Sequence, residues 1–210
     1  MKFDKKQALL YFVKYPTSGR VKTRLARTVG DQEAAKLYSD LTERNLGVIA
    51  PLHQQKIFDL VVVFDPPERK EDVKRWISLS CEYFQQSVGD LGERLTHAFE
   101  AVFRGGGKRV MALGSDTLGL TTDIILQGFE ALQSNDVVVG PAEDGGYYLI
   151  GLSHFQPKLF EGIAWSTCEV LPQTYKAISN LRLSYQTLCP LDDLDEIKNS
   201  PTKAGQGEKI

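Results

Sequence analysis

The sequence predicts an α/β protein in which a mostly parallel sheet lies between two layers of helices. Short apolar runs, rich in β-branched and aromatic residues, alternate with helical patterns along the chain. Several of these runs are continuously apolar, as expected for strands that are buried on both faces. The length of 210 residues, with 42% hydrophobic and 25% charged residues, suits one domain with a full core. We therefore expect a Rossmann-like three-layer α/β/α sandwich formed by residues 1–199 as a single domain, followed by a mobile tail at 200–210 that is poor in apolar residues.

Each expected element follows from its own pattern. Short apolar runs predict strands at residues 8–13, 60–64, 82–85, 110–113, 137–139, 147–150 and 185–188. Apolar residues at three- and four-residue spacing predict helices at 31–50, 68–79, 91–103, 121–132 and 169–181. In a sheet of this kind ligands bind beyond the carboxyl ends of the strands, so the loops that follow the strands are the informative segments.

Composition excludes several classes of protein. A net charge of −2 gives no reason to expect a nucleic acid partner or binding to an anionic membrane. The three cysteines are widely spaced and form no metal-binding or disulfide pattern, so reduced thiols in a cytoplasmic protein are expected. The first residues lack the features of a signal peptide, and no apolar stretch approaches the ~20 residues of a membrane span. A homodimer is left open.

A basic loop follows the first expected strand. Residues 14–27 contain five cations and no acid, and Pro16 and Gly19 indicate a loop before a helix. Arginine, lysine and the backbone N–H groups at a helix start are suited to binding a polyphosphate. The loop is not a Walker A motif, because Pro16 and Val21 stand where that motif needs glycines. A solvated basic turn is the alternative. The residues predicted to bind a nucleotide are Lys14, Gly19, Arg20, Lys22, Thr23 and Arg24. If these cations are exposed, they should contribute little to the stability of the free protein.

Asp116 follows the apolar strand at 110–113, within the segment Gly114-Ser115-Asp116-Thr117. A carboxylate at the carboxyl end of a central strand can hold Mg²⁺, which takes about six oxygen ligands, several of them water and phosphate. The alternative is that Asp116 or Ser115 caps a turn or the next helix.

A Gly-rich acidic turn at 140–151 separates two expected strands. Gly145 and Gly146 allow a positive φ and the close approach of a ligand. Glu143 and Asp144 add acceptors suited to sugar hydroxyls or a metal-bound water. A hairpin-like turn of purely structural purpose is the alternative.

Three shorter segments are further candidates, each with a structural alternative. The acidic cluster at 192–196 completes a metal site with Asp116 or begins a short helix. Asp90 and Glu93 have capping-box spacing, yet the surrounding glycines would let a base or ribose approach. The nucleotide-binding residues predicted in this segment are Gly89, Asp90 and Gly92. The segment Trp165-Ser166-Thr167 is expected to contact substrate. The alternative is that Trp165 belongs to the core.

These motifs, taken in order, resemble those of a bacterial group of proposed glycosyltransferases. The group is related to 2-phospho-lactate guanylyltransferase and lies in the nucleotide-diphospho-sugar transferase (GT-A) superfamily. The resemblance covers residues 8–195 and rests on Phe12-Val13-Lys14 with Pro16, Gly19 and Lys22-Thr23-Arg24-Leu25, on Gly89-Asp90-Leu91-Gly92-x-Arg94, on Gly-x-Asp at 114–116, on Gly-Pro-Ala-x-Asp-Gly-Gly-Tyr-Tyr at 140–148, on Trp165-Ser166-Thr167 and on Asp-x-Asp at 193–195.

The resemblance implies a GT-A-like sheet and an Mg²⁺ or Mn²⁺ site that uses Asp116. A late aspartate, Asp193 or Asp195, would supply a second metal ligand. The chain departs from the family pattern in two places. It has Ser115-Asp116-Thr117-Leu118 where the family usually has Thr-Asp-Cys-Pro, and Ile197-Lys198 stand where a further acidic pair is usual.

Residues and resemblance together predict a metal-dependent transferase. The donor is a nucleotide-sugar or a nucleoside triphosphate, and a glycosyl or nucleotidyl group passes to a small-molecule acceptor. We expect catalytic roles for Lys22, Asp116 and Asp144. The residues expected to contact substrate are Asp144, Gly145, Gly146, Tyr147, Trp165, Ser166 and Thr167. A non-catalytic nucleotide sensor on the same fold is the alternative.

Overall fold

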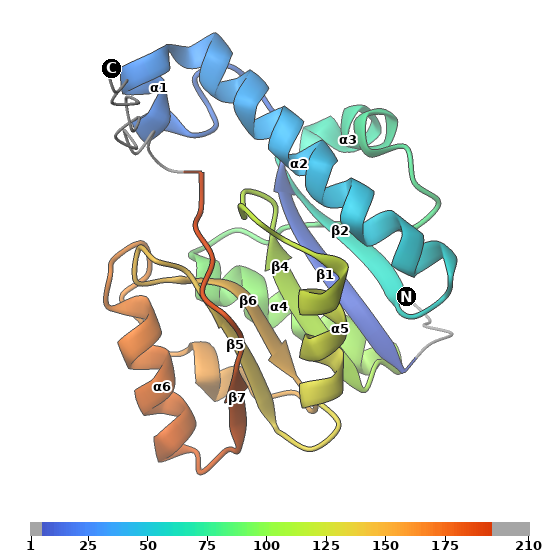
Figure 1. The fold of residues 1–210 in the computed structure, drawn as a ribbon, viewed down its shortest axis with the longest axis vertical. Coiled ribbons are helices and arrows are strands. Elements are labelled where there is room, and N and C mark those ends of the chain that lie inside the picture. The colour runs from blue at the N-terminus through green and yellow to red at the C-terminus, as the bar shows by residue number, and fades with distance from the viewer. Residues whose placement is uncertain (1–5, 195–210) are drawn as a thin grey trace, which may run out of the picture.

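The computed structural model describes residues 6–194, which form a seven-stranded sheet with helices on both faces (Figure 1). The strand order is β3-β2-β1-β4-β6-β5-β7, and every pairing is parallel except those of β6, which is antiparallel to both neighbours. The strands are β1 (Gln7–Lys14), β2 (Asp59–Asp65), β3 (Glu82–Gln85), β4 (Arg109–Gly114), β5 (Val137–Pro141), β6 (Tyr147–Leu152) and β7 (Tyr185–Thr187).

Two hydrophobic clusters, one on each face of the sheet, hold the layers together. Along β1 the side chains alternate between the two clusters: Leu9 and Tyr11 belong to the first, Ala8 and Leu10 to the second. The first cluster includes α2 (Asp31–Gln54), α3 (Lys70–Ile77) and α5 (Thr122–Ala131), and the second includes α4 (Leu91–Arg104) and α6 (Val170–Asn180). The predicted three-layer α/β/α sandwich is therefore confirmed.

Four features differ from the expected elements. A separate short helix, α1 (Thr23–Val29), precedes α2, and the segment after β2 begins with the 3₁₀ turn η1 (Pro67–Arg69). A second 3₁₀ turn, η2 (Pro157–Phe160), follows β6. Helix α2 continues past residue 50 and through Pro51. Its last turn is stabilised by two interactions: the Gln55 N–H donates to the Pro51 carbonyl at 3.0 Å, and Leu52 is buried in the first cluster.

One edge of the sheet gathers all the loops that carry predicted site residues. The parallel strands end there, and β6 begins there because it runs in the opposite direction. Strand β1 is flanked by β2 on one side and β4 on the other, so the direction of chain progression reverses between β1 and β4. Ligands of open α/β sheets bind in the crevice at this reversal point. None of the described helices is long and apolar enough to cross a membrane.

Candidate functional site

The basic loop after β1 is built from two tight turns. Thr17 N–H donates to the Tyr15 carbonyl at 2.7 Å, and Arg20 N–H donates to the Thr17 carbonyl at 2.9 Å. Gly19 has φ +74°, a conformation that favours glycine. Lys22, with φ +47° and ψ +47°, is in the left-handed conformation and precedes the first residue of α1. This sparsely populated backbone geometry sets the direction in which the Lys22 side chain leaves the loop.

Lys22 and Asp116 form an ion pair between the loops that follow β1 and β4. The Lys22 Nζ atom lies 2.5 Å from Asp116 Oδ2, and the side chains are 9% and 33% exposed. The expectation of exposed cations is therefore wrong for Lys22, which is nearly buried against an acid almost a hundred residues away in the chain. Arg20, Thr23 and Arg24 are exposed, as expected for this loop.

Helix α2 fixes the loop that carries Asp116. The hydroxyl groups of Tyr38 and Ser115 are hydrogen-bonded at 2.7 Å, and the Lys14 N–H donates to the same tyrosine oxygen at 2.8 Å. Asn45, 2% exposed, donates from Nδ2 to the carbonyls of Ser115 and Thr117 at 3.2 and 2.9 Å. Burial raises the pKa of the Tyr38 hydroxyl, so it stays neutral and can hold both loops.

Of the alternative in which Asp116 or Ser115 caps a turn or the next helix, the helix part is wrong, while both residues do lie in a turn. The residue that caps α5 is Thr121, whose hydroxyl accepts from the Ile124 N–H at 3.4 Å. Ser115 is engaged with Tyr38 instead. Asp116 is thus held at the crevice with its carboxylate beside Lys22.

The segment after β7 brings the late acidic cluster to the Asp116 loop. Glu143 N–H donates to the Leu191 carbonyl at 3.2 Å, and Leu191 forms a bridge with Ala142 of the acidic turn. Thr117 is then bridged with Asp193, and Leu194 N–H donates to the Asp116 carbonyl at 3.0 Å. Asp193 therefore lies beside the loop that carries Asp116, as the metal hypothesis requires, whereas Asp195 lies outside the described residues.

The chemistry at Asp116 fits a metal that is shared with a phosphate ligand. Within residues 6–194 there is no group of three or more His, Cys, Asp or Glu side chains that could hold a metal ion. Mg²⁺ is commonly bound by one or two carboxylates, with substrate phosphates and water as the other ligands. A partly exposed carboxylate at the crevice is suited to such a site, but a metal ion there would compete with the ammonium of Lys22 for the same carboxylate.

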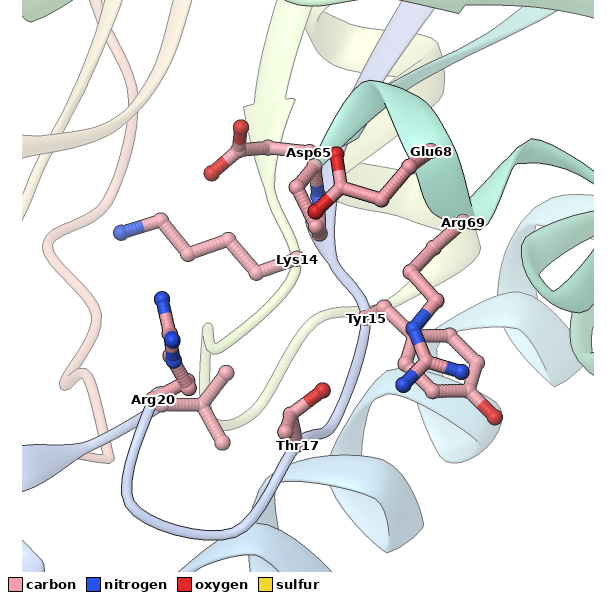
Figure 2. Close-up of a pocket in the computed structure, with 9 residues that line it drawn as sticks. Lys14, Tyr15, Thr17, Arg20, Asp65, Glu68 and Arg69 are labelled. Atoms are coloured by element: carbon pink, nitrogen blue, oxygen red, sulfur yellow. The ribbon is translucent and has the colours of Figure 1, made fainter.

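A cavity of about 390 Å³ lies between the loops that follow β1 and β2 (Figure 2). The Lys14 and Arg20 side chains point into the same open space, and the Asp65 carboxylate stands beside it. At the other end of the cavity the guanidinium of Arg69 lies 5.2 Å from the centre of the Tyr15 ring. Lys14 and Arg20 are among the residues predicted from the sequence, whereas Asp65 and Arg69 are not, although Asp65 ends a buried strand just as Asp116 follows one.

The Gly-rich turn is held by the protein's own backbone. Gly145 has φ +91°, and a Cβ atom there would lie 2.5 Å from the Cys168 carbonyl oxygen. The Leu171 N–H donates to the Gly145 carbonyl at 2.9 Å. The Asp144 carboxylate accepts from the Gly146 N–H at 2.8 Å, and Gly146 itself does not have a positive φ. The close approach at Gly145 is therefore made by Cys168, and the expected positive φ is confirmed for Gly145 only.

Trp165 lies between this turn and helix α4. Its ring contacts Tyr147 edge to face, with centroids 6.4 Å apart. A Cβ atom on Gly92 would lie 2.6 Å from the indole Nε1, so the glycine makes room for the Trp165 ring. Ser166 and Thr167 are exposed and follow it in a local turn, in which the Thr167 hydroxyl donates to the Ala164 carbonyl at 2.7 Å.

The capping-box alternative at the start of α4 is confirmed. Asp90 Oδ1 accepts from the Glu93 N–H, and Glu93 Oε2 accepts from the Asp90 N–H, both at 2.9 Å. Arg94, one residue further, reaches back and donates to Gln86 Oε1 at 3.0 Å. Gln86 donates in turn to the Val13 carbonyl at the end of β1. Gln86 and Arg94 were not selected as site residues, and contact of Gly89, Asp90 or Gly92 with a nucleotide stays a prediction.

Comparisons with solved structures identify proteins of the same fold. The chain is 34% identical to a proposed nucleotide-diphospho-sugar transferase from Desulfovibrio desulfuricans G20, with a TM-score of 0.86 over 96% of this chain and 92% of that chain. CMP:2-keto-3-deoxy-manno-octonic acid synthetase in complex with CTP has a TM-score of 0.54 at 13% identity, over 91% and 94% of the chains. Glucosyl-3-phosphoglycerate synthase from Mycobacterium tuberculosis, in complex with Mn²⁺, UDP and glucosyl-3-phosphoglycerate, has a TM-score of 0.50 at 10% identity, over 90% and 71%.

The last two similarities show the fold alone, and the search of curated proteins found no match. The structural neighbours nevertheless include both nucleotidyltransferases and glycosyltransferases. The chain therefore has the nucleotide-diphospho-sugar transferase fold and belongs to the bacterial family DUF2064, described as "uncharacterized protein conserved in bacteria", whose model matches residues 48–167.

Proposed function

We propose that this chain is a metal-dependent transferase that uses a nucleoside triphosphate or a nucleotide-sugar as donor. It would pass a nucleotidyl or glycosyl group to a small-molecule acceptor. The observation that carries the proposal is the ion pair between Lys22 and Asp116, which joins the basic loop to a strand-end carboxylate across the reversal point of the sheet. The fold, which is shared with nucleotidyltransferases and glycosyltransferases, supports it.

The basic loop supplies the groups that would hold the donor phosphates. Lys14 and Arg20 point into the cavity of about 390 Å³, a size typical of small-molecule sites. Their charges would neutralise the phosphates, and Lys22 would face the negative charge that develops on the leaving group. Tyr38 and Asn45 would keep the two loops at a fixed separation, so that phosphate and carboxylate meet in one geometry.

Asp116 would hold Mg²⁺ or Mn²⁺, with Asp193 as the second candidate ligand. The metal would supply further neutralisation of the phosphate charge. Asp144 stays a proposed catalytic residue. Its Oδ1 atom accepts from Gly146 N–H, which leaves the second oxygen of the carboxylate to orient a substrate hydroxyl. Tyr147 and the segment 165–167 are proposed to contact the acceptor.

The test is calorimetric titration with the common nucleoside triphosphates and nucleotide-sugars, each in Mg²⁺, Mn²⁺ or EDTA. We expect at least one ligand to bind only with metal, and ³¹P NMR to show its consumption when an acceptor is supplied. Asp116→Asn should abolish the dependence on metal. Asp123→Asn, an exposed carboxylate in the first turn of α5, is the matched control and should retain it.

Two results would contradict the proposal in different ways. An unchanged metal dependence in Asp116→Asn would remove Asp116 from the site. Tight nucleotide binding without any consumption of donor, across a broad acceptor panel, would favour a nucleotide sensor on the same fold.

A further inference from the structure

The ammonium group of Lys22 stands at the place proposed for the metal. Lys22 Nζ lies 2.5 Å from Asp116 Oδ2, and the lysine side chain is nearly buried. The other carboxylate oxygen, Oδ1, lies close to its own strand end, where a Cβ atom on Gly114 would be 3.2 Å away. Mg²⁺ binds a carboxylate oxygen at about 2.0–2.1 Å, so a metal on Oδ2 would lie within about 5 Å of the ammonium group. Lys22 therefore occupies space that the metal needs.

The ion pair is also electrically neutral, which weakens its attraction for a divalent ion. The charge of the Asp116 carboxylate is cancelled by Lys22. Among residues 6–194, no group of three or more His, Cys, Asp or Glu side chains is placed to compensate. A dication and an ammonium group on the same oxygen would repel each other, most strongly where water is partly excluded. A free metal ion would therefore gain little from Asp116 while Lys22 is in place.

Only the side chain of Lys22 has to move to relieve this competition. Its backbone is held at the start of α1, where the Ala26 N–H donates to the Lys22 carbonyl at 2.9 Å. The lysine side chain is a flexible four-carbon chain that ends in a compact charge, so it can exchange one anionic partner for another. Arg20, two residues earlier, points into the cavity proposed to hold the donor phosphates (Figure 2). A phosphate bound by this loop is an alternative anionic partner for Lys22.

We propose that Lys22 is an internal counter-ion that keeps Asp116 closed to free divalent metal until a phosphate donor binds. The phosphate takes over the ammonium group, and Asp116 Oδ2 is released to the metal that arrives with the phosphate. Metal and donor therefore bind together, and each strengthens the binding of the other. The inference rests on the proposed function, because it takes Asp116 as a metal ligand.

Mn²⁺ in the absence of any phosphate is the first probe. The electron paramagnetic resonance signal of hydrated Mn²⁺ falls when the ion binds to protein, which gives its affinity at a fixed pH. We expect Lys22→Met to bind Mn²⁺ about tenfold more tightly than the parent, an effect between those of exposed and buried ion pairs. Lys22→Arg keeps the charge and should keep the parent affinity. Lys36→Met removes an exposed lysine of α2, changes the net charge equally and should also bind like the parent.

Double variants show whether the gain in affinity arises at Asp116. In the Asp116→Asn background, Lys22→Met should bring no gain, because no carboxylate is left to release. In the Asp123→Asn background, which lacks an exposed carboxylate in the first turn of α5, the gain should persist.

Inorganic pyrophosphate in the presence of Mg²⁺ is the second probe, and the expected effect has the opposite sign. In calorimetric titration, Lys22→Met should bind pyrophosphate about tenfold more weakly than the parent, because a charged donor to the phosphate is lost. A purely structural role of Lys22 would weaken the binding of both probes, since a distorted crevice holds neither.

An Mn²⁺ affinity of Lys22→Met no higher than that of the parent would overturn the proposal, and so would a gain that persists with Asp116→Asn. Unchanged pyrophosphate binding would overturn it as well, because the ammonium group would then have no phosphate to move to.

Titration of the parent with nucleoside triphosphates and nucleotide-sugars tests the transferase function separately. A parent that binds none of them contradicts that function, even where Lys22→Met gains affinity for Mn²⁺. A parent that binds them, without a gain for Mn²⁺ in Lys22→Met, contradicts only the counter-ion role of Lys22.

Discussion

Replacing Lys22 with alanine removes the cation that faces Asp116 and one of the groups proposed to hold phosphate. Exposed ion pairs contribute about 0–1 kcal/mol to stability, and breaking a buried pair costs about 3–5 kcal/mol. Lys22 is 9% exposed, while Asp116 is 33% exposed and can be hydrated. We therefore expect Lys22→Ala to lower the free energy of unfolding by about 1–2 kcal/mol. For a chain of this length that corresponds to roughly 2–8 °C in Tm.

The comparison variant is Arg20→Ala, because Arg20 is an exposed cation in the same loop. Its stability should change by less than about 0.5 kcal/mol, as for most exposed sites. A nucleotide at ~100 times its Kd should stabilise the parent by about 2.7 kcal/mol, and both variants should lose most of that gain. Lys36→Ala, an exposed lysine on α2, should behave like the parent in both measurements.

Scanning calorimetry of the variants with and without nucleotide separates the two roles of Lys22. A parent-like Tm for the free Lys22→Ala protein would show that the ion pair does not support the fold. A full nucleotide-induced shift in Lys22→Ala would refute the role of Lys22 in phosphate binding, whatever its effect on the free protein.

Two further changes test the framework around the site, and a third tests a carboxylate at the opposite edge of the sheet. Gly145→Ala should destabilise the protein by about 1–3 kcal/mol in urea unfolding, because φ is positive and the Cβ would meet the backbone of Cys168; parent-like stability would show that the turn can relax. Asn45→Ala should cost about 1–3 kcal/mol, since two backbone carbonyls of the β4–α5 loop lose a buried donor, and its nucleotide affinity should fall as well. The hydroxyl of Ser184, aided by its backbone N–H, holds the pKa of Asp136 below the usual range. The stabilising contribution of the Asp136 carboxylate is therefore present above the unfolded pKa of about 3.9 and is lost as pH falls through the folded pKa. We expect the free energy of unfolding, measured between pH 2 and 5, to depend less on pH in Asp136→Asn than in the parent.

The layers, and the edge of the sheet at which the candidate loops meet, could be predicted because they follow from apolar periodicity. The alternation of Leu9 and Leu10 between two clusters is the direct result of a strand buried on both faces. The reversed direction of β6 could not be predicted, since a six-residue apolar run reads the same in either orientation.

The ion pair that Lys22 of the basic loop forms with Asp116 could not be predicted, for a different reason. Nothing in the residues around Lys22 indicates that an acid from another loop lies 2.5 Å away. One feature of the sequence does indicate such a partner. Asn45 falls on the buried stripe of an expected helix, two turns after Tyr38. A polar residue on such a stripe must find a buried partner, which here is the Asp116 loop.

The fit of Trp165 against Gly92 has a consequence for how related sequences can diverge. A side chain at position 92 would meet the indole at 2.6 Å and the Phe160 carbonyl oxygen at 2.8 Å. The clash with the indole could be relieved by a smaller residue at 165, but the clash with the backbone oxygen of residue 160 is present whatever side chain stands there. Across an alignment, we therefore expect glycine at 92 to be retained even where 165 is not aromatic.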